Sequence, residues 1–338
     1  MNLAQLVITV ATVGGVYALL ALALNLQLGQ GGLINFGVVA YFTAGAYGYV
    51  ILVQPPPTAF DSYKFGFGLP MWAAFIGAGV AAVIFALITG WPCLRLRGEY
   101  LALTTFAFAE VFGSLVTNGT AVTNGTLGFT GLSQPFEMAI PGEAYSWFLA
   151  ALVTCAVAVT FIIVQRLTSA PFGRALRALR DDELAAGLAG KDVRRLRLQA
   201  FLIGALISGF AGAIYAWYST LVSPELFSAD VTFTVFIALA IGGIGSNVGA
   251  VAGAVVLIGF QEIVRGLATN PVISSRVGAV EIALEGLLFI VILRVAPGGA
   301  AELLQRLRVR LTKRKHPGEA ATRPEPALAG AGESEAGK

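Results

Sequence analysis

Charged side chains are concentrated in one segment of an otherwise apolar chain. Between Thr168 and Arg197 the sequence carries seven basic and four acidic residues. Arg174, Arg177 and Asp181 follow one another at intervals of three and four residues, so they lie on one side of an α-helix. Such a segment is suited to binding, because a soluble partner can hold an otherwise apolar protein only through a charged element of this kind.

The segment is predicted to form one helix from Pro171 to Gly190. Proline is favoured in the first turn of a helix, and glycine is favoured just after its last turn. A short helix with charged flanks and a narrow apolar stripe suits insertion into a groove on another protein. The alternative is a helix that lies on anionic lipid, but the acidic residues of the segment repel acidic headgroups. The stripe consists of Ala175, Leu176, Leu179 and Ala186.

The motifs of enzymatic sites are missing from the sequence. The nearest approach to a phosphate-binding loop is the string 187–191, and Asp192 follows it where that motif needs a hydroxyl group for magnesium. His316 is the only histidine, so neither a Ser-His triad nor a histidine-based metal site can be built. Cys93 and Cys155 lie in apolar runs and are expected to be small buried residues. We therefore expect no enzyme activity, no metal and no cofactor.

Glu110 is an ionisable residue near the middle of an apolar run. A carboxylate at the centre of a bilayer costs about 3 kcal/mol or more, so Glu110 should face the interior of the helix bundle or water. A role in a pathway through the membrane and a role as a structural hydrogen-bond anchor both remain open. Its candidate polar partners, which we assign to the same pathway, are Asn25, Asn35, Thr104 and Thr105.

Glycines cluster at two places where helices are expected to end or break. The first cluster is Gly29, Gly31 and Gly32, and the second is Gly242, Gly243, Gly245 and Gly249. Glycine permits positive φ angles and close approach of the backbone, and broken helices in membrane proteins line water-filled paths. Gly242, Gly243 and Gly245 are therefore further candidate pathway residues. Helix ends and tight packing are the alternative explanation for each of them.

Membrane-spanning helices are the elements that must position these residues. Hydrophobic residues make up 57% of the 338 residues, charged residues only 12%, and the mean hydropathy is +0.78. An average soluble domain has roughly 25% charged residues. The predicted fold class is an all-α, polytopic integral membrane protein with about nine transmembrane helices and a cytoplasmic coupling helix. Eight or ten spans remain possible because the seventh run is short. The nine runs are Leu3–Leu24, Leu33–Val53, Pro70–Leu94, Tyr100–Val116, Tyr145–Val164, Leu198–Tyr218, Val231–Ile241, Val248–Val264 and Val280–Val295.

Lysine and arginine gather on one side of these spans. The basic clusters are Arg95–Arg97, Arg174–Arg197 and Arg294–Lys315, whereas three of the loops on the other side contain only Lys64. The positive-inside rule places the basic clusters in the cytoplasm and the N-terminus outside. We expect three parts, namely a membrane domain 1–297 with the charged segment 168–197, a basic juxtamembrane segment 298–315, and a disordered tail 316–338.

Four stretches of the chain match a family in their order and composition. Together they cover most of residues 20–300, and the chain resembles the permease subunits of bacterial branched-chain amino-acid ABC transporters, of the LivM type. The early motif departs from the family's common pattern at residues 34–38, which lack a histidine. The four stretches are 24–47 (LNLQLGQGGLINFGVVAYFTAGAY), 94–110 (LRLRGEYLALTTFAFAE), the charged segment with the span after it, and 242–254 (GGIGSNVGAVAGA).

The resemblance implies a permease that forms half of a transmembrane pathway in the bacterial inner membrane. It implies cytoplasmic ATP-binding subunits, a second and paralogous permease subunit, a periplasmic substrate-binding protein and membrane lipid as partners, and no nucleic acid. It also implies that the charged segment docks the ATPase, with Arg174, Arg177 and Asp181 beside an E-A-A…G pattern. That pattern falls on Glu183, Ala185, Ala186 and Gly190.

The cargo that the resemblance implies is branched-chain or other hydrophobic amino acids. Two alternatives remain open. One is a permease of the same kind for urea or short amides. The other is an ion-coupled secondary transporter, in which the charged segment is incidental and no ATPase is needed.

Overall fold

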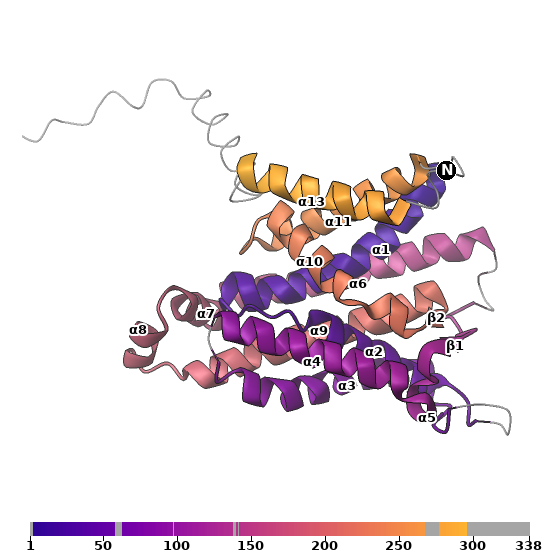
Figure 1. Ribbon diagram of the computed structural model, residues 1–338, viewed down its shortest axis with the longest axis horizontal. Coiled ribbons are helices and arrows are strands. Elements are labelled where there is room, and N and C mark those ends of the chain that lie inside the picture. Colours follow the sequence, from indigo (N-terminus) through magenta and orange to yellow (C-terminus); the bar gives the residue numbers. More distant parts are fainter. Residues whose placement is uncertain are drawn as a thin grey trace, which may run out of the picture.

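Helices make up most of the part of the chain that the computed structural model describes, which is residues 3–57, 63–96, 98–137, 140, 142–267 and 277–295. The long helices run nearly side by side along one direction (Figure 1). The predicted juxtamembrane segment 298–315 and tail 316–338 lie outside the described residues. The long helices are α1 (Leu3–Leu24), α2 (Val38–Val53), α3 (Met71–Cys93), α4 (Glu99–Asn118), α6 (Glu143–Ser169), α9 (Val193–Ser219), α10 (Ala229–Gly242), α11 (Asn247–Leu267) and α13 (Val277–Val295).

Shorter elements connect these helices at their ends. A π-helical turn, η1, continues α1 without interruption. η1 spans Asn25–Gln30. The remaining elements are α5 (Thr120–Thr123), α7 (Pro171–Asp181), α8 (Glu183–Leu188), the 3₁₀ turns η2 (Gly125–Leu127) and η3 (Pro224–Phe227), and the strands β1 (Phe129–Thr130) and β2 (Leu221–Val222).

Seven helical segments among the described residues are long and apolar enough to cross a membrane. An all-α, polytopic membrane fold is therefore confirmed, whereas the count of nine spans stays a prediction. The short seventh run is part of a longer segment, Pro224–Gly242, because η3 leads directly into α10. Two further apolar helices are shorter, namely α2 and Ile282–Val291 within α13. The second predicted span begins later than expected, at Val38 instead of Leu33.

The core lies where α1, α2 and α9 pack together, with α3 and α11 on either side. Small residues allow this close packing, as expected of helices in a membrane. A Cβ atom on Gly45 of α2 would overlap the backbone of Gly209 on α9, and one on Gly212 would overlap the backbone carbonyl of Phe42. Cys93 is buried as predicted, but the prediction for Cys155 is wrong, since it is exposed on α6.

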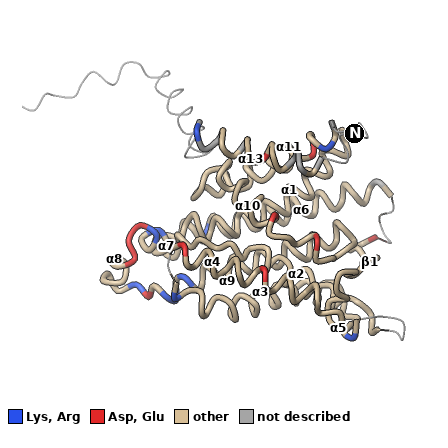
Figure 2. The backbone as a smooth tube through the Cα atoms, viewed as in Figure 1, with Lys and Arg blue, Asp and Glu red and all other residues tan. Residues whose placement is uncertain are grey.

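The two ends of the bundle differ in charge and structure. At one end, β1 pairs antiparallel with β2, which joins the long loop after α4 to the loop after α9. At the other end, α7 and α8 project beyond the long helices (Figure 1). Lysine and arginine gather around α7 and α8, and the helical body between the ends carries few charges (Figure 2). This distribution agrees with the predicted placement of the charged segment on one side of the membrane.

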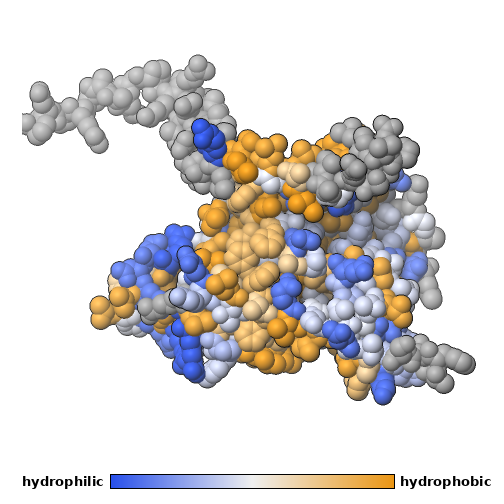
Figure 3. All heavy atoms as spheres, viewed as in Figure 1, coloured by the Kyte–Doolittle hydropathy of each residue, from blue (hydrophilic) through white to orange (hydrophobic). Residues whose placement is uncertain are grey.

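The outer surface of α3 is apolar along its whole length. Trp72 and Trp91 stand at its two ends with exposed fractions of 71% and 60%. At 1.5 Å per residue they are about 28 Å apart along the helix, close to the thickness of the hydrocarbon core. Tryptophan is enriched at both membrane interfaces, so this surface has the pattern of a lipid-facing helix. Figure 3 shows the broad apolar band across the face in view, with hydrophilic residues gathered at the end of α7 and α8.

Candidate functional site

The charged segment folds as two helices instead of one. α7 and α8 are separated at Asp182, whose backbone is extended. The carboxylate of Asp182 accepts hydrogen bonds from the backbone N–H groups of Leu184 (2.9 Å) and Ala185 (3.0 Å). The prediction of one continuous helix is therefore wrong, because Asp182 acts as the N-cap of a second helix.

The predicted start and end of the segment are confirmed. Pro171 opens α7 in its first turn. Gly190 adopts a φ of 77°, and its N–H donates to the carbonyl of Gly187 at 3.0 Å. The N–H of Lys191 donates to the carbonyl of Ala186 at 3.1 Å. These two bonds form a Schellman motif, which requires the left-handed backbone that glycine adopts easily.

One side of α7 and α8 packs against the body of the protein. Leu176, Leu179 and Ala186 are buried there, as the predicted stripe requires. Glu183 is half-buried and forms an ion pair of 2.8 Å with Arg197 at the start of α9. The short helix α8 is thereby fixed to the long helix that follows it.

The other side of the two helices is exposed. Arg174, Asp181, Ala185 and Gly190 lie on it. Two apolar side chains are also exposed here, Leu184 with 70% and Leu188 with 91% of its surface. The seven predicted coupling residues therefore divide between an outward group of four, an inward residue Ala186, and two partly buried residues, Arg177 and Glu183.

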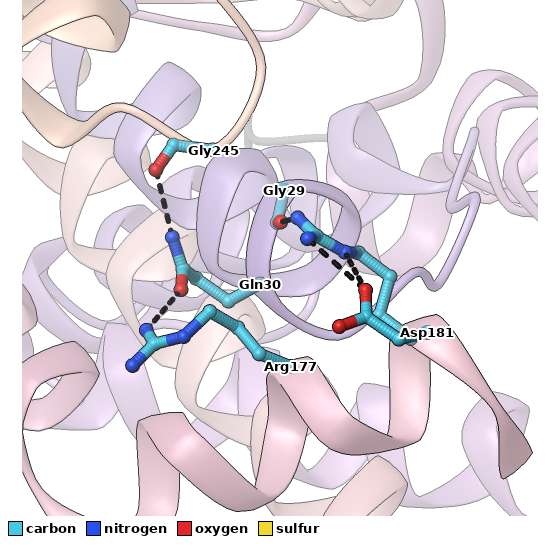
Figure 4. Close-up of polar contacts among 6 residues, drawn as sticks. Gly29, Gln30, Arg177, Asp181 and Gly245 are labelled. Carbon is cyan, nitrogen blue, oxygen red and sulfur yellow. Dashed lines mark hydrogen bonds and ion pairs between the residues drawn. The ribbon is translucent and has the colours of Figure 1, made fainter. Parts of the chain in front are cut away.

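Two arginines of α7 hold the end of η1 (Figure 4). Arg177 donates from one guanidinium nitrogen to Oε1 of Gln30 at 2.8 Å and to the carbonyl of Thr168 at 3.0 Å. Arg180 donates to the carbonyl of Gly29 at 2.6 Å and also pairs with Asp181 at 3.2 Å. The last carbonyls of a helix carry partial negative charge, so cationic side chains stabilise them.

Gln30 and Asn25 connect η1 to the turn between α10 and α11. The side-chain amide of Gln30 donates to the carbonyl of Gly245 at 2.8 Å, so Gln30 bridges Arg177 to this turn (Figure 4). Asn25 accepts from the N–H of Gly245 at 2.8 Å and donates to Asn247 at 2.8 Å. Asn247 in turn donates to Gln165 near the end of α6 at 2.8 Å. Four segments that are distant in the sequence therefore meet in one polar network.

The glycines at 242–245 shape the turn that this network holds. Gly243 and Gly245 have φ angles of 105° and 93°, which other residues rarely adopt. Gly242 packs against Gly249 so closely that a Cβ atom would overlap the carbonyl oxygen of Gly249. Gly242 and Gly243 are buried and Gly245 is partly buried. Their geometry accounts for a tight turn between two helices.

A second part of the network holds the loop between η1 and α2. Asn35 donates to Oε1 of Gln27 at 2.8 Å and accepts from the N–H of Gly37 at 2.8 Å. Thr105 of α4 accepts from the N–H of Phe36 at 3.0 Å. Asn25, Asn35 and Thr105 are all buried, so they join segments of the protein to one another.

Glu110 lies apart from these residues. It is on the exposed side of α4, so the expected orientation toward the interior of this chain's bundle is not observed. Thr104, which is partly exposed, donates back to the carbonyl of Tyr100 at 2.7 Å. The structure therefore separates Glu110 from Asn25, Asn35 and Thr105.

Several residues of the network were not identified from the sequence. Most of them are polar residues at the ends of apolar runs, and that position is the signal that could have indicated them, because a polar side chain that is buried there needs a hydrogen-bond partner. They are Gln27, Gln30, Gln165, Thr168, Arg180 and Asn247.

Known proteins similar to this chain are permeases. Compared with the high-affinity branched-chain amino acid transport system permease protein LivM of Escherichia coli K12, the chain is 31% identical over 280 residues, which cover 76% of this chain and 63% of that protein. The probable LivM of Methanocaldococcus jannaschii is 28% identical over 267 residues, or 71% of this chain and 75% of that protein. LivH of E. coli K12 is 26% identical over 267 residues, or 73% and 80%.

The similarity to the E. coli LivM protein spans less than two thirds of its length. Residues 6–293 of this chain, nearly all of its described helices, match the family described as branched-chain amino acid transport system / permease component. The chain therefore belongs to this family of membrane permeases.

Proposed function

We propose that this chain is a permease subunit of an ATP-driven importer in the bacterial inner membrane and that its cargo is branched-chain or other hydrophobic amino acids. The family and the names of the LivM and LivH relatives support this cargo. In the proposed transporter, cytoplasmic ATP-binding subunits hydrolyse ATP, and a periplasmic binding protein delivers the cargo. A second, paralogous permease subunit completes the pathway.

The observation that carries the proposal is the two-sided structure of α7 and α8. Their outward side combines charged residues with Leu184 and Leu188, whose exposed fractions are 70% and 91%. Exposed leucines are costly in water but suit a pocket on a soluble partner, with the surrounding charges at its rim. We assign this outward side to the docking of the ATP-binding subunit.

The inward side provides a rigid connection from the docking surface to the membrane helices. Arg177 and Arg180 bond to η1, and Gln30 extends that connection to Gly245. Charge-assisted hydrogen bonds are among the stronger polar contacts in proteins. A displacement of α7 by the ATPase is therefore passed to the ends of α1, α6, α10 and α11 together.

Substitution of the most exposed leucine tests the docking surface. Leu188→Glu places a charge where an apolar contact is proposed, so it should reduce co-purification of the ATP-binding subunit at least tenfold without reducing membrane insertion. Leu127→Glu is the matched control, because Leu127 is 72% exposed and lies in η2 at the other end of the molecule. Equal recovery of the ATPase with both variants would contradict the proposal.

Two alternatives give different results in simple assays. An ion-coupled secondary transporter takes up its substrate in vesicles that hold an ion gradient and contain neither ATP nor an ATPase. A permease for urea or short amides depends on a binding protein that binds those compounds. Measurement of ligand binding by the cognate binding protein therefore separates this cargo from hydrophobic amino acids.

A further inference from the structure

The exposed side of α4 carries polar residues through half of its length. Glu110, Ser114 and Asn118 follow one another at intervals of four residues, and all three are exposed. At 1.5 Å per residue, Glu110 lies about 17 Å from the first residue of α4 and about 12 Å from the last. Glu110 is thus close to the middle of a helix that is apolar enough to cross the membrane. Figure 3 shows hydrophilic residues set within the apolar band, away from α7 and α8.

This side of α4 exposes apolar residues such as Val111 and Leu115, as α3 does, but it differs from the lipid-facing pattern of α3 by the polar residues among them. The exposed residues of α3 between Trp72 and Trp91 include Ile76, Val80 and Ile84, and they are apolar. A carboxylate in the same part of the membrane costs about 3 kcal/mol when it faces lipid. We infer that the face of α4 around Glu110 lies against protein and water. The second permease subunit is the occupant that the proposed function supplies, and the inference rests on that function.

Aromatic rings lie on the inner side of Glu110. Phe106 is one turn inward on α4, and the centre of its ring is 6.2 Å from that of Phe233 on α10. Phe233 is 46% exposed and lies 5.8 Å from Phe36, whose ring stacks on Phe236 at 4.3 Å. An apolar surface of four rings from three segments therefore begins at Phe106, one helical turn from Glu110. Such rings accept an apolar side chain, and their faces also attract cations.

A hydrogen-bond donor lies on the outer side of Glu110. The amide of Asn118 donates to the carbonyl of Ser114 at 2.8 Å and to the hydroxyl oxygen of Ser114 at 3.3 Å. Because this oxygen accepts a bond from Asn118, the hydroxyl proton of Ser114 remains able to donate. Ser114 is about 6 Å from Glu110 along the helix axis. This spacing matches a small molecule that carries a cationic and an anionic group close together.

We propose that Glu110 binds the ammonium group of the cargo in the middle of the membrane. Ser114 donates a hydrogen bond to the cargo's carboxylate, and the phenylalanine rings receive its apolar side chain. The ligand class is a zwitterion with a primary ammonium group and a hydrophobic side chain. The second permease subunit closes this path on the side away from α4.

Uptake by the complete transporter tests the role of the carboxylate. In proteoliposomes that contain both permeases, the ATPases and the binding protein, Glu110→Gln should lower leucine uptake per ATP hydrolysed at least tenfold, and Glu110→Asp should recover part of it. Glu99→Gln is the matched control, since it removes a charge from the exposed first turn of the same helix. An uptake ratio for Glu110→Gln within twofold of the control overturns the proposal. If loaded binding protein fails to stimulate hydrolysis by the unaltered transporter, the proposed function itself is wrong.

A thiol-labelling experiment on the assembled transporter tests the path without using cargo. Single cysteines are placed at Ser114 and, as a lipid-facing control, at Ile84, with Cys93 and Cys155 replaced by alanine. A membrane-impermeant cationic methanethiosulfonate should label S114C at least tenfold faster than I84C. Adding E110Q should slow the cationic reagent at least threefold while leaving a neutral reagent unaffected. Equal labelling of the two cysteines, or a rate that does not depend on the charge of the reagent, overturns the proposal.

Discussion

Replacement of Arg177 by methionine should weaken the attachment of α7 to the ends of η1 and α6, while Arg180 still bonds to Gly29. The guanidinium group donates two hydrogen bonds, to Gln30 at 2.8 Å and to Thr168 at 3.0 Å, and Arg177 is partly buried. Hydrogen bonds to a charged group contribute about 1.5 kcal/mol each at the low end of their range, so the two together contribute about 3 kcal/mol. That energy corresponds to a change of roughly 150-fold in the equilibrium between attached and detached α7. Methionine keeps an unbranched apolar side chain as long as the part of arginine up to Nε, and it lacks the donors.

Hydrogen exchange of the α7 amides in the purified permease measures this equilibrium directly. Arg177→Met should accelerate exchange by about two orders of magnitude. Arg174→Met is the control, because Arg174 lies one turn earlier on the exposed side and donates to the carbonyl of Ser169 at 3.2 Å. An exposed contact of this kind contributes less than about 1 kcal/mol. In the complete transporter, Arg177→Met should bind the ATPase normally and import less cargo per ATP hydrolysed.

Equal exchange rates in α7 for Arg177→Met and Arg174→Met would contradict the predicted role of the Arg177 contacts. Faster exchange with unchanged transport per ATP would show that α7 is attached to η1 without transmitting motion through it.

Two further substitutions test the local geometry. Gly243→Ala should lower the thermal unfolding temperature, because alanine at a φ of 105° costs about 1–3 kcal/mol. Gly113→Ala, inside α4 where an added Cβ atom meets nothing within 4 Å, should leave the unfolding temperature unchanged or raise it. Equal unfolding temperatures of the two variants would show that a side chain at residue 243 does not strain the turn. Asp182→Ala should remove the N-cap of α8 and cost about 1 kcal/mol, which hydrogen exchange in residues 183–188 reports. Asp181→Ala is the exposed neighbour for comparison, and no difference between the two would exclude the capping role.

The membrane-spanning helices could be located from the sequence because the bilayer limits their composition and length. Pro171 and Gly190 indicated the start and the end of the charged helical segment, because the backbone preferences of proline and glycine act locally. The break at Asp182 was missed because an aspartate within a charged helical pattern has two uses. It can stand on the helix surface, or it can cap a new helix, and only the packing of Leu179 and Ala186 selects between them.

The orientation of Glu110 and the polar network could not be derived from the sequence. The run around Glu110 is mostly apolar, and its few polar residues can face either a water-filled path or the bundle, so the pattern does not indicate which side faces the bundle. The network joins residues that are far apart in the chain, such as Asn25 with Asn247 and Gln30 with Arg177. Its partners are set by how the helices pack. The π-helical form of η1 was likewise hidden, because Gly29 suggested a break where the helix in fact continues.

The tryptophan residues of α3 relate the position of α7 and α8 to the thickness of the membrane. Trp91 stands at the C-terminal end of α3, and the guanidinium carbon of Arg194 lies 5.5 Å from the centre of its ring. Arg194 belongs to the first turn of α9, directly after α8, and α3 packs along α9. A bilayer thicker than the 28 Å or so between the tryptophans must thin locally around α3, whereas a thinner bilayer makes α3 tilt, each at a fraction of a kcal/mol per Å. Acyl-chain length therefore acts on α9, the helix that follows α8, so in the proposed transporter the lipid composition of the membrane and the ATP-binding subunit act on the same helix.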